Sequence, residues 1–432
     1  MVGGGYRCTV HPSGEQAERR AALDAGTPYA RPFEHRELPP LRENPNADDL
    51  VRRALLVNAE LEARYWEWRA AIEQIPQDGT QPTNLALFGG LDITKGAVSR
   101  EGTTVGLGND PMADILLPPK LSHAARRALE NARAAGFRFR KTQFELRAKV
   151  LSAYADYALS AELLRLERSN AELLQTAMMV VEAKNRTGLG GQQDLLRARN
   201  ELDLSRNDVA NLESQLPARR AALNALVGRP ADADLLPPAA LPLPRPIAAD
   251  DAEVLSLVAA RNPEMLALSH ELKAQAEGVR LAGLQYLPDV SLSAGTDLSG
   301  VTQSLAGMVT APVLRYEAIR AAVAQAEAKL RAGEAMRRQA GNDLSAQVVS
   351  DLTTVRDADR QLALAEGTIL PRARQAVIVS RSSYEAGRAS LIDLIDAQRS
   401  LIAIERLAAT LRASREKRLA DLETMSARSL TI

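Results

Sequence analysis

The chain has 432 residues, and its 54 lysines and arginines balance its 54 aspartates and glutamates. A protein without excess positive charge is a poor partner for nucleic acid, so we expect no nucleic-acid binding. Aromatic residues make up 3% of the chain beside 46% hydrophobic residues, many of which are Ala and Leu. This balance favours long helices that pack closely through small side chains over a globular core built on large aromatic residues.

The sequence predicts neither a transmembrane helix nor a signal peptide. It contains no run of about eighteen apolar residues and so predicts no transmembrane helix. Its first residues, MVGGGYRCTVHPSGEQAERR, have no apolar stretch, and we expect no signal peptide within the given sequence. A lone cysteine, Cys8, excludes an internal disulfide framework.

Residues 1–45 are polar and rich in proline, which predicts an irregular N-terminal arm. Within it, Cys8 and His11 belong to the pattern Y-x-C-x-x-H-P. A thiolate and an imidazole at this spacing can bind a soft or borderline metal, but two ligands do not complete a site. We therefore keep two interpretations, a metal-binding arm and an arm without metal, of which the second needs fewer assumptions.

Two stretches with helical periodicity, residues 48–75 and 250–285, occupy equivalent places in the two halves of the chain. The sequences VNAEL around Asn58 and RNPEM around Asn262 look like the same local joint. We predict two tandem repeats, residues 46–231 and 250–432. The linker between them, residues 232–249, contains LLPPAALPLPRP and is expected to be extended and stiff.

After each of these helices the periodicity changes to two, which predicts strands near residues 84–93, 103–112, 289–298 and 303–311. Leu85 and Leu87 share one face, and Val290 and Leu292 oppose Ser291 and Ser293. An apolar face opposed by a polar one fits a membrane barrel, but it also fits a soluble hairpin that covers helices. Two strand pairs are too few to bury a sheet alone, so both interpretations stay open.

The longest helical stretch without proline runs from Lys120 to about Arg186, on the order of 100 Å at a rise of 1.5 Å per residue. Its counterpart, residues 313–386, contains Pro371, which should kink it. Each stretch ends in a glycine turn, and a heptad pattern resumes from Leu195 and from Leu394. These features predict two long antiparallel coiled-coil hairpins.

The two turns are copies of one plan. Five residues of the first turn region recur 199 positions later, so that Gly188, Asp194, Leu195, Ala198 and Leu202 correspond to Gly387, Asp393, Leu394, Ala397 and Leu401. The order of a helix, two strands, a very long helix, a glycine tip and a heptad helix, given twice, resembles the TolC family of outer membrane efflux channels. The tip sequences RTGLGGQQDLLRAR and YEAGRASLIDLIDAQRSL and the segment ALNALVG carry the resemblance, and ILLPPKL is similar to the metal-exporting branch.

The resemblance implies a fold that is mostly α with a small β part. Four strands from each chain would contribute to a twelve-stranded transmembrane β-barrel in a homotrimer, with a helical tunnel in the periplasm. It also implies an outer membrane location, contact with outer membrane lipid, and two protein partners. These are a periplasmic adaptor protein and an inner-membrane pump of the resistance-nodulation-division type.

The resemblance further assigns roles at the tips. Asp393 and Asp396 match an aspartate pair that lines the channel constriction, where rings of carboxylates would filter cations; alternatively they are ordinary acids at a helix N-terminus. Tyr384 and Asp194 match a polar lock that holds the mouth shut, and Arg388 lies one position from the arginine of that lock. The expected adaptor-docking surface comprises the tip residues Arg186, Thr187, Gly188, Leu189, Ala386 and Gly387.

The implied function is passive conduction of metal ions or small toxic compounds, with no cofactor. The alternative is a periplasmic coiled-coil adaptor or scaffold without a pore, which would share the heptads but would not need the strands. An enzyme is not expected, because the four histidines are scattered without a nucleophile or carboxylate pattern around them, and no glycine-rich phosphate loop is present.

Overall fold

The computed structural model describes residues 9–42, 44–94, 96–100, 102–110, 114–188, 190–238, 240–247, 250–300 and 302–430. The chain forms two compact units. Unit 1 comprises residues 1–27, 63–139 and 263–342, and unit 2 comprises residues 28–62, 140–262 and 343–432. Each unit thus contains segments from both halves of the sequence.

The sequence predicts an irregular N-terminal arm over residues 1–45. This prediction is wrong for part of the segment, which forms a helix. Helix α1 spans Glu15–Ala25, where the sequence has no proline. In unit 1 the indole Nε1 of Trp68 donates to Glu18 at 2.9 Å, and Arg19 pairs with Glu73 at 2.8 Å. The prolines that motivated the prediction begin only after this helix, so they mark the end of α1 rather than the state of the whole segment.

The sequence predicts one helix at the start of each repeat, and in the structure each of these helices is divided into two. Helix α2 (Ala47–Val57) gives way to α3 (Ala59–Gly79), and α6 (Asp251–Arg261) gives way to α7 (Pro263–Gly283). Asn58 adopts extended backbone and its side chain accepts from the backbone N–H of Leu61 at 3.0 Å, so it caps the second helix of its pair. At the second break Pro263 supplies no backbone N–H, which ends one helix and starts the next. The repeated sequence around Asn58 and Asn262 therefore marks a helix break in each repeat.

The strands of unit 1 form one antiparallel sheet in the order β1-β4-β5-β6. Their bounds are Leu85–Gly90 for β1, Thr104–Asn109 for β4, Asp289–Asp297 for β5 and Gln303–Thr310 for β6. A separate short pair joins β2 (Ile93–Thr94) to β3 (Ala97–Val98). The two predicted strand pairs therefore combine, because β4 of the first repeat pairs with β5 of the second.

The register of the sheet sorts its side chains into two unlike faces. Leu87 pairs with Leu107, Leu107 with Ala294, and Ala294 with Leu305, so these four residues form an apolar row across the sheet. Side chains alternate between faces along a strand. The face of this row also carries Leu85, Val105, Val290, Leu292 and Val309. The opposite face carries Ser291, Ser293, Ser304, Thr104 and several glycines, together with Phe88 and Met308.

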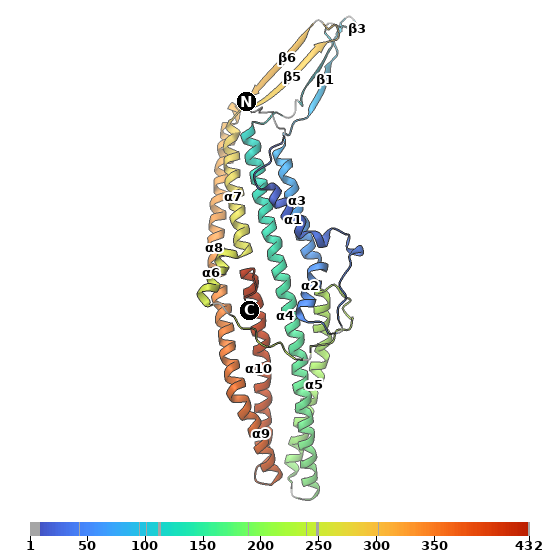
Figure 1. Ribbon diagram of the computed structural model, residues 1–432, viewed down its shortest axis with the longest axis vertical. Coiled ribbons are helices and arrows are strands. Elements are labelled where there is room, and N and C mark those ends of the chain that lie inside the picture. Colours follow the sequence, from blue (N-terminus) through green and yellow to red (C-terminus); the bar gives the residue numbers. More distant parts are fainter. Residues whose placement is uncertain are drawn as a thin grey trace. The chain divides into compact units, whose positions relative to one another are not determined.

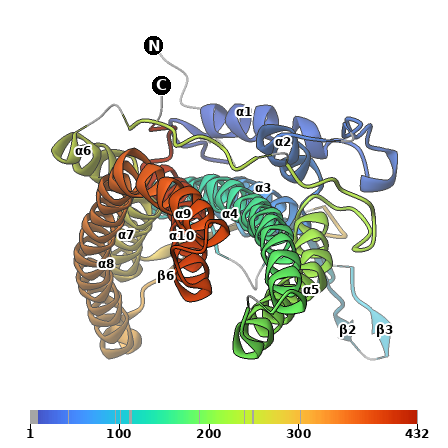
Figure 2. The same cartoon turned by 90° about the horizontal axis from the view of Figure 1, so that it is seen from below.

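Unit 2 contains both hairpin ends, which lie side by side in Figures 1 and 2. The first joins α4 (Pro118–Arg186) to α5 (Gln192–Leu226), and the second joins α9 (Leu370–Glu385) to α10 (Leu391–Ser426). The first residues of each heptad pattern are buried, namely Leu195, Ala198 and Leu202 in α5 and Leu394 in α10. The long hairpins predicted from the sequence are confirmed.

The second long helix is interrupted near Pro371 by a change of helix type. Helix α8 covers Tyr316–Leu364, a π-helical turn covers Ala365–Ile369, and α9 follows at once. Pro371 has no N–H for the carbonyl four residues earlier, and a π-turn inserts one extra residue into the ladder at such a place. Remaining three-residue 3₁₀ turns are Thr27–Tyr29, Phe33–His35, Leu284–Tyr286 and Val313–Arg315.

The linker between the repeats has no helix or strand within its described residues. Two buried leucines, Leu235 and Leu241, hold the linker to the rest of unit 2. Leu241 packs with Ala158, Ala409 and Ala413. Because both leucines are anchored, this extended segment is fixed along part of its length.

Candidate functional site at the hairpin tips

The tip of the first hairpin is a glycine turn. Gly188 has φ +75°, in the left-handed region, and its N–H donates to Asn185 at 3.1 Å. The hydroxyl of Thr187 donates to the carbonyl of Lys184 at 3.0 Å, and Arg186 is exposed and pairs with Glu182 at 2.9 Å. Leu189, the remaining predicted docking residue of this tip, lies outside the described residues.

The tip of the second hairpin also turns at a glycine with positive φ, but here a side chain caps the helix that follows. Gly387 has φ +71°, and the N–H groups of Arg388 and Ala389 both donate to the carbonyl of Ser383. Ser390 then caps α10 through a capping box with Asp393. Ala386 and Gly387, the predicted docking residues of this tip, are exposed, and so is Arg388, which was predicted to belong to the lock.

The two aspartates predicted to line a constriction lie in the first turns of α10, and both are exposed. Asp393 Oδ2 accepts from the backbone N–H of Ser390 at 2.9 Å and from its hydroxyl at 2.7 Å. These bonds hold the pKa of Asp393 below its ordinary value. Asp393 therefore serves the helix start, as the simpler interpretation required.

Tyr384 is buried in the apolar cluster that joins the two tips, which also contains Val181, Leu195 and Leu391. Burial, followed by the negative charge of Asp194, raises the pKa of its phenol. The charge of Asp194 thus acts on the Tyr384 phenol, and the polar lock between the two residues stays a prediction. The ammonium of Lys184 lies 4.1 Å from the centre of the Tyr384 ring and donates to the Tyr384 carbonyl at 2.6 Å. Sequence reasoning missed Lys184, which carries no motif.

A ladder of ion pairs links the two hairpins next to the tips. Arg399 of α10 donates to Glu201 of α5 at 3.2 Å, and Arg406 lies 3.4 Å from Asp208. The two arginines and the two acids are each seven residues apart, so the pairs repeat with the heptad. Heptad spacing of opposite charges was the sequence signal that could have revealed them.

The deepest partner in this ladder is Glu167 of α4, whose side chain is 3% exposed. It accepts from Ser205 at 2.8 Å and from Asn170 at 3.0 Å, and the guanidinium of Arg406 reaches it from the other hairpin. We call this set the hairpin clasp, comprising Glu167, Glu201, Ser205, Asp208, Arg399 and Arg406. A cavity of about 380 Å³ lies among these residues.

The predicted pair of metal ligands, Cys8 and His11, is not tested by the structure. Cys8 lies outside the described residues, and the Nδ1 atom of His11 is 2.9 Å from Glu15 Oε2. Among the described residues, no group of three or more His, Cys, Asp or Glu side chains is arranged to hold a metal ion. His123 pairs with Glu277 and His270 with Glu130 in unit 1.

Within the part of the chain that the structure describes, no helix is both long enough and apolar enough to span a bilayer.

Two long hairpins and a sheet with one apolar face define a class of channel-forming proteins of the outer membrane. The family model described as "Outer membrane efflux protein" matches residues 50–229 and 254–428, and the chain belongs to this family. Its members are transport channels rather than enzymes, and they reside in the outer membrane.

Individual proteins are similar over different lengths. The pyoverdine export outer membrane protein OpmQ of Pseudomonas aeruginosa is 24% identical over 402 residues, 86% of this chain and 82% of that protein. The fusaric acid resistance protein FusA of Burkholderia cepacia is 27% identical over 184 residues, which is 42% of this chain and only 34% of FusA. The crystal structure of the outer membrane protein VceC from Vibrio cholerae superimposes with a TM-score of 0.75 at 17% identity, over 89% of this chain and 96% of VceC. The similarity to the VceC structure establishes the fold of this chain.

Proposed function

We propose that this protein is the passive exit duct of a tripartite efflux system, and that three copies of the chain assemble to form it. The observation that carries the proposal is the sheet. Leu87 and Leu305 on its apolar face are 74% and 78% exposed in the single chain, and the opposite face carries serines, threonines and glycines beside Phe88 and Met308. Lipid on one side and water on the other would satisfy both faces.

The edges of the sheet support the trimer. Among the described residues, β1 pairs only with β4 and β6 pairs only with β5, so each outer edge leaves backbone groups without a strand partner. Unpaired backbone groups are costly in a lipid environment, and only a closed barrel removes such edges. Three copies with four strands each would close a barrel of twelve strands.

The tips would form the periplasmic mouth. The exposed turn residues would receive a periplasmic adaptor protein, which would connect the channel to an inner-membrane pump of the resistance-nodulation-division type. Since hairpins that part would open the mouth, the hairpin clasp and the Lys184–Tyr384 contact favour the closed state. Asp393 and Asp396 would line the constriction as a filter for cations.

The cargo is a small solute. OpmQ is named for the export of pyoverdine and FusA for resistance to fusaric acid, which supports organic compounds as cargo for this chain. The sequence similarity of residues 115–121 to the metal-exporting branch leaves metal ions as the alternative cargo. Neither cargo requires the channel to supply energy, which would come from the pump.

The experiment that tests the proposal compares arginine substitutions on neighbouring residues of β6. Leu305→Arg places a charge on the apolar face, and Ser304→Arg places the same charge on the polar face. A charge facing lipid near the middle of a barrel costs about 2–4 kcal/mol, whereas one facing water costs little. We expect Leu305→Arg to abolish recovery of a membrane-embedded trimer and Ser304→Arg to preserve it, as measured by the mass of the detergent-extracted particle. Equal behaviour of the two variants, or a wild-type chain that is soluble and not trimeric, would favour a coiled-coil scaffold instead.

A further inference from the structure

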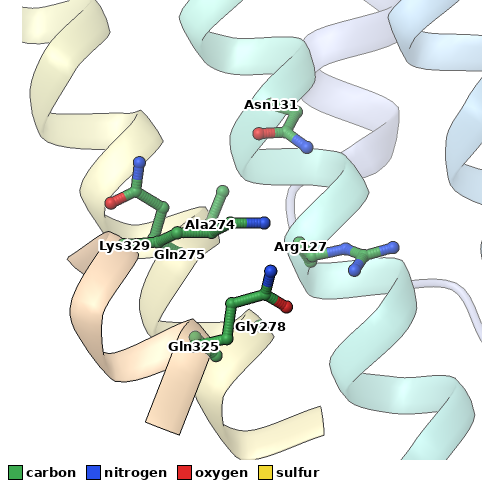
Figure 3. Close-up of a pocket in the computed structure, with 8 residues that line it drawn as sticks. Arg127, Asn131, Ala274, Gln275, Gly278, Gln325 and Lys329 are labelled. Carbon is green, nitrogen blue, oxygen red and sulfur yellow. The ribbon is translucent and has the colours of Figure 1, made fainter. Parts of the chain in front are cut away.

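A hollow between α4, α7 and α8 in unit 1 is shown in Figure 3. Asn131, Gln325 and Lys329 line this hollow and are exposed, so water reaches most of the polar groups there. A cavity in unit 2 differs in this respect, because its lining includes a side chain with a buried polar atom that has no partner. The cavity in unit 2 is therefore the better candidate for a ligand site.

This cavity has a volume of about 180 Å³ and is formed by both hairpins close to their tips. Its apolar walls come from α4 of the first hairpin and from α9 and α10 of the second, and they include Leu173, Ala177, Val180, Val377 and Leu394. Tyr384 also lines the cavity, which is thus continuous with the apolar cluster that joins the two tips. We call it the tip cavity.

The polar exception in this lining is Gln398 of α10. The residue is 6% exposed, and within the described residues its Oε1 atom is buried and accepts no hydrogen bond. Two other polar residues of the lining are engaged, since the hydroxyl of Thr176 donates to the carbonyl of Glu172 at 3.0 Å and Arg381 pairs with Glu385 at 3.0 Å. Buried polar atoms are nearly always paired in folded proteins. A hydrogen-bond donor inside the tip cavity would satisfy the acceptor of Gln398.

Gln398 also lines the cavity among the residues of the hairpin clasp, which we call the clasp cavity. The cationic side chains of the clasp cavity are committed to carboxylates, because Arg399 donates to Glu201 and Arg406 donates to Glu167. Neither arginine donates to Gln398. The donor that Gln398 lacks is therefore not supplied from the clasp side, which leaves the tip cavity as its source.

The volume and charge of the tip cavity limit what can occupy it. An engineered apolar cavity of about 150 Å³ takes up benzene. A volume of about 180 Å³ therefore suits one ring with a single small substituent. An ionised ligand is disfavoured, because a charge in apolar surroundings is costly without a partner. The charged residues of the lining, Arg381 and Glu385, are exposed and pair with each other.

We propose that the tip cavity binds a small phenol. The ring would pack against Ala177, Val377 and Leu394, and the hydroxyl would donate to the Oε1 atom of Gln398. Because both hairpins contribute walls, a bound phenol would hold them together; this consequence for the closed state rests on the function proposed above. The binding itself does not depend on conduction.

Fluorine NMR titrations of the detergent-purified protein test the proposal with two probes of nearly the same shape, para-fluorophenol and para-fluorotoluene. Gln398→Leu removes the acceptor and keeps the walls apolar. It should weaken binding of the phenol at least about fivefold relative to binding of the toluene, the loss expected for one hydrogen bond. Ala177→Leu places a larger side chain in the tip cavity and should abolish the binding of both probes.

Ala403→Leu is the matched control, because Ala403 of α10 lines the clasp cavity and not the tip cavity. It should leave both affinities at the wild-type level, and uptake of the probes by detergent is the same for every variant. Equal weakening of both probes by Gln398→Leu, equal effects of the two alanine variants, or no binding by wild type would each overturn the proposal. Failure of the proposed channel to conduct would leave these titrations unchanged.

Discussion

Replacing Arg406 by glutamine should loosen the contact between the two hairpins and raise the resting conductance of the channel. Arg406 is the only residue of the described clasp that reaches the buried carboxylate of Glu167 from the other hairpin. A hydrogen bond to a charged group contributes about 1.5–3 kcal/mol. Because the Arg406 side chain is 39% exposed, the low end of this range applies, about 1.5–2 kcal/mol.

This energy corresponds to a factor of about 10–30 per chain in the equilibrium between joined and separated hairpins. Ser205 and Asn170 would still donate to Glu167, so the carboxylate would keep partners and the fold should survive. The assay is the open probability of single channels in a planar bilayer, and we expect it to rise by at least this factor, because each chain of the proposed trimer carries the substitution. A double-mutant cycle with Glu167→Gln should show that the two effects are not additive.

Arg374 supplies the matched control. It pairs with Glu405 at 3.0 Å, but both residues belong to the second hairpin. Arg374→Gln removes an arginine from the same region without touching the contact between hairpins, so the open probability should stay at the wild-type level. Equal effects of Arg374→Gln and Arg406→Gln would refute the reasoning, because a general loss of positive charge would then explain both.

Three further predictions concern the tips and their surroundings. Gly387→Ala should lower the free energy of unfolding by about 1–2 kcal/mol in chemical denaturation, since φ is +71° there, whereas Gly283→Ala, at φ −63° and with open space around an added Cβ, should not lower it. Tyr384→Phe should increase the ion leak of the resting channel in planar bilayers, and an unchanged leak would remove Tyr384 from the lock. Burial and the neighbouring Asp351 raise the pKa of Asp421 above its ordinary value of 3.8, so the folded state binds this proton more tightly than the unfolded state does. Stability from this group is therefore lost as pH rises from about 4 through the folded pKa, and Asp421→Asn should gain thermal stability over wild type across that window; a gain that is independent of pH would contradict this.

The helical hairpins could be predicted because their determinants are local. The glycines at positions 188 and 387 adopt positive φ, and the heptads that follow them are buried at their first turns. The breaks at Asn58 and Asn262 were visible as a repeated joint, although the periodicity on each side looked continuous. Helix α1 was missed because prolines later in the segment outweighed the proline-free stretch before them.

The contacts at the site could be predicted only in part. The polar lock between Tyr384 and Asp194 stays a prediction, since only an electrostatic effect of Asp194 on the Tyr384 phenol connects the two residues. Lys184 and Glu167 carry no local signal for their contacts to the second hairpin, because those partners are 200 and 239 residues away. Pairing of β4 with β5 likewise depends on residues from different repeats, which no short-range pattern encodes. Such long-range partners are fixed by packing, and only a tertiary structure reveals them.

The most direct test of the account is single-channel conductance of the detergent-purified protein in a planar bilayer, with and without a divalent cation on the tip side. The wild-type protein should show small cation-selective steps that the divalent cation blocks, and the double variant Asp393→Ala/Asp396→Ala should conduct without block. Absence of conductance from wild type would contradict the channel itself. Conductance that is blocked equally in both proteins would contradict the acidic constriction and leave the aspartates as helix-capping residues.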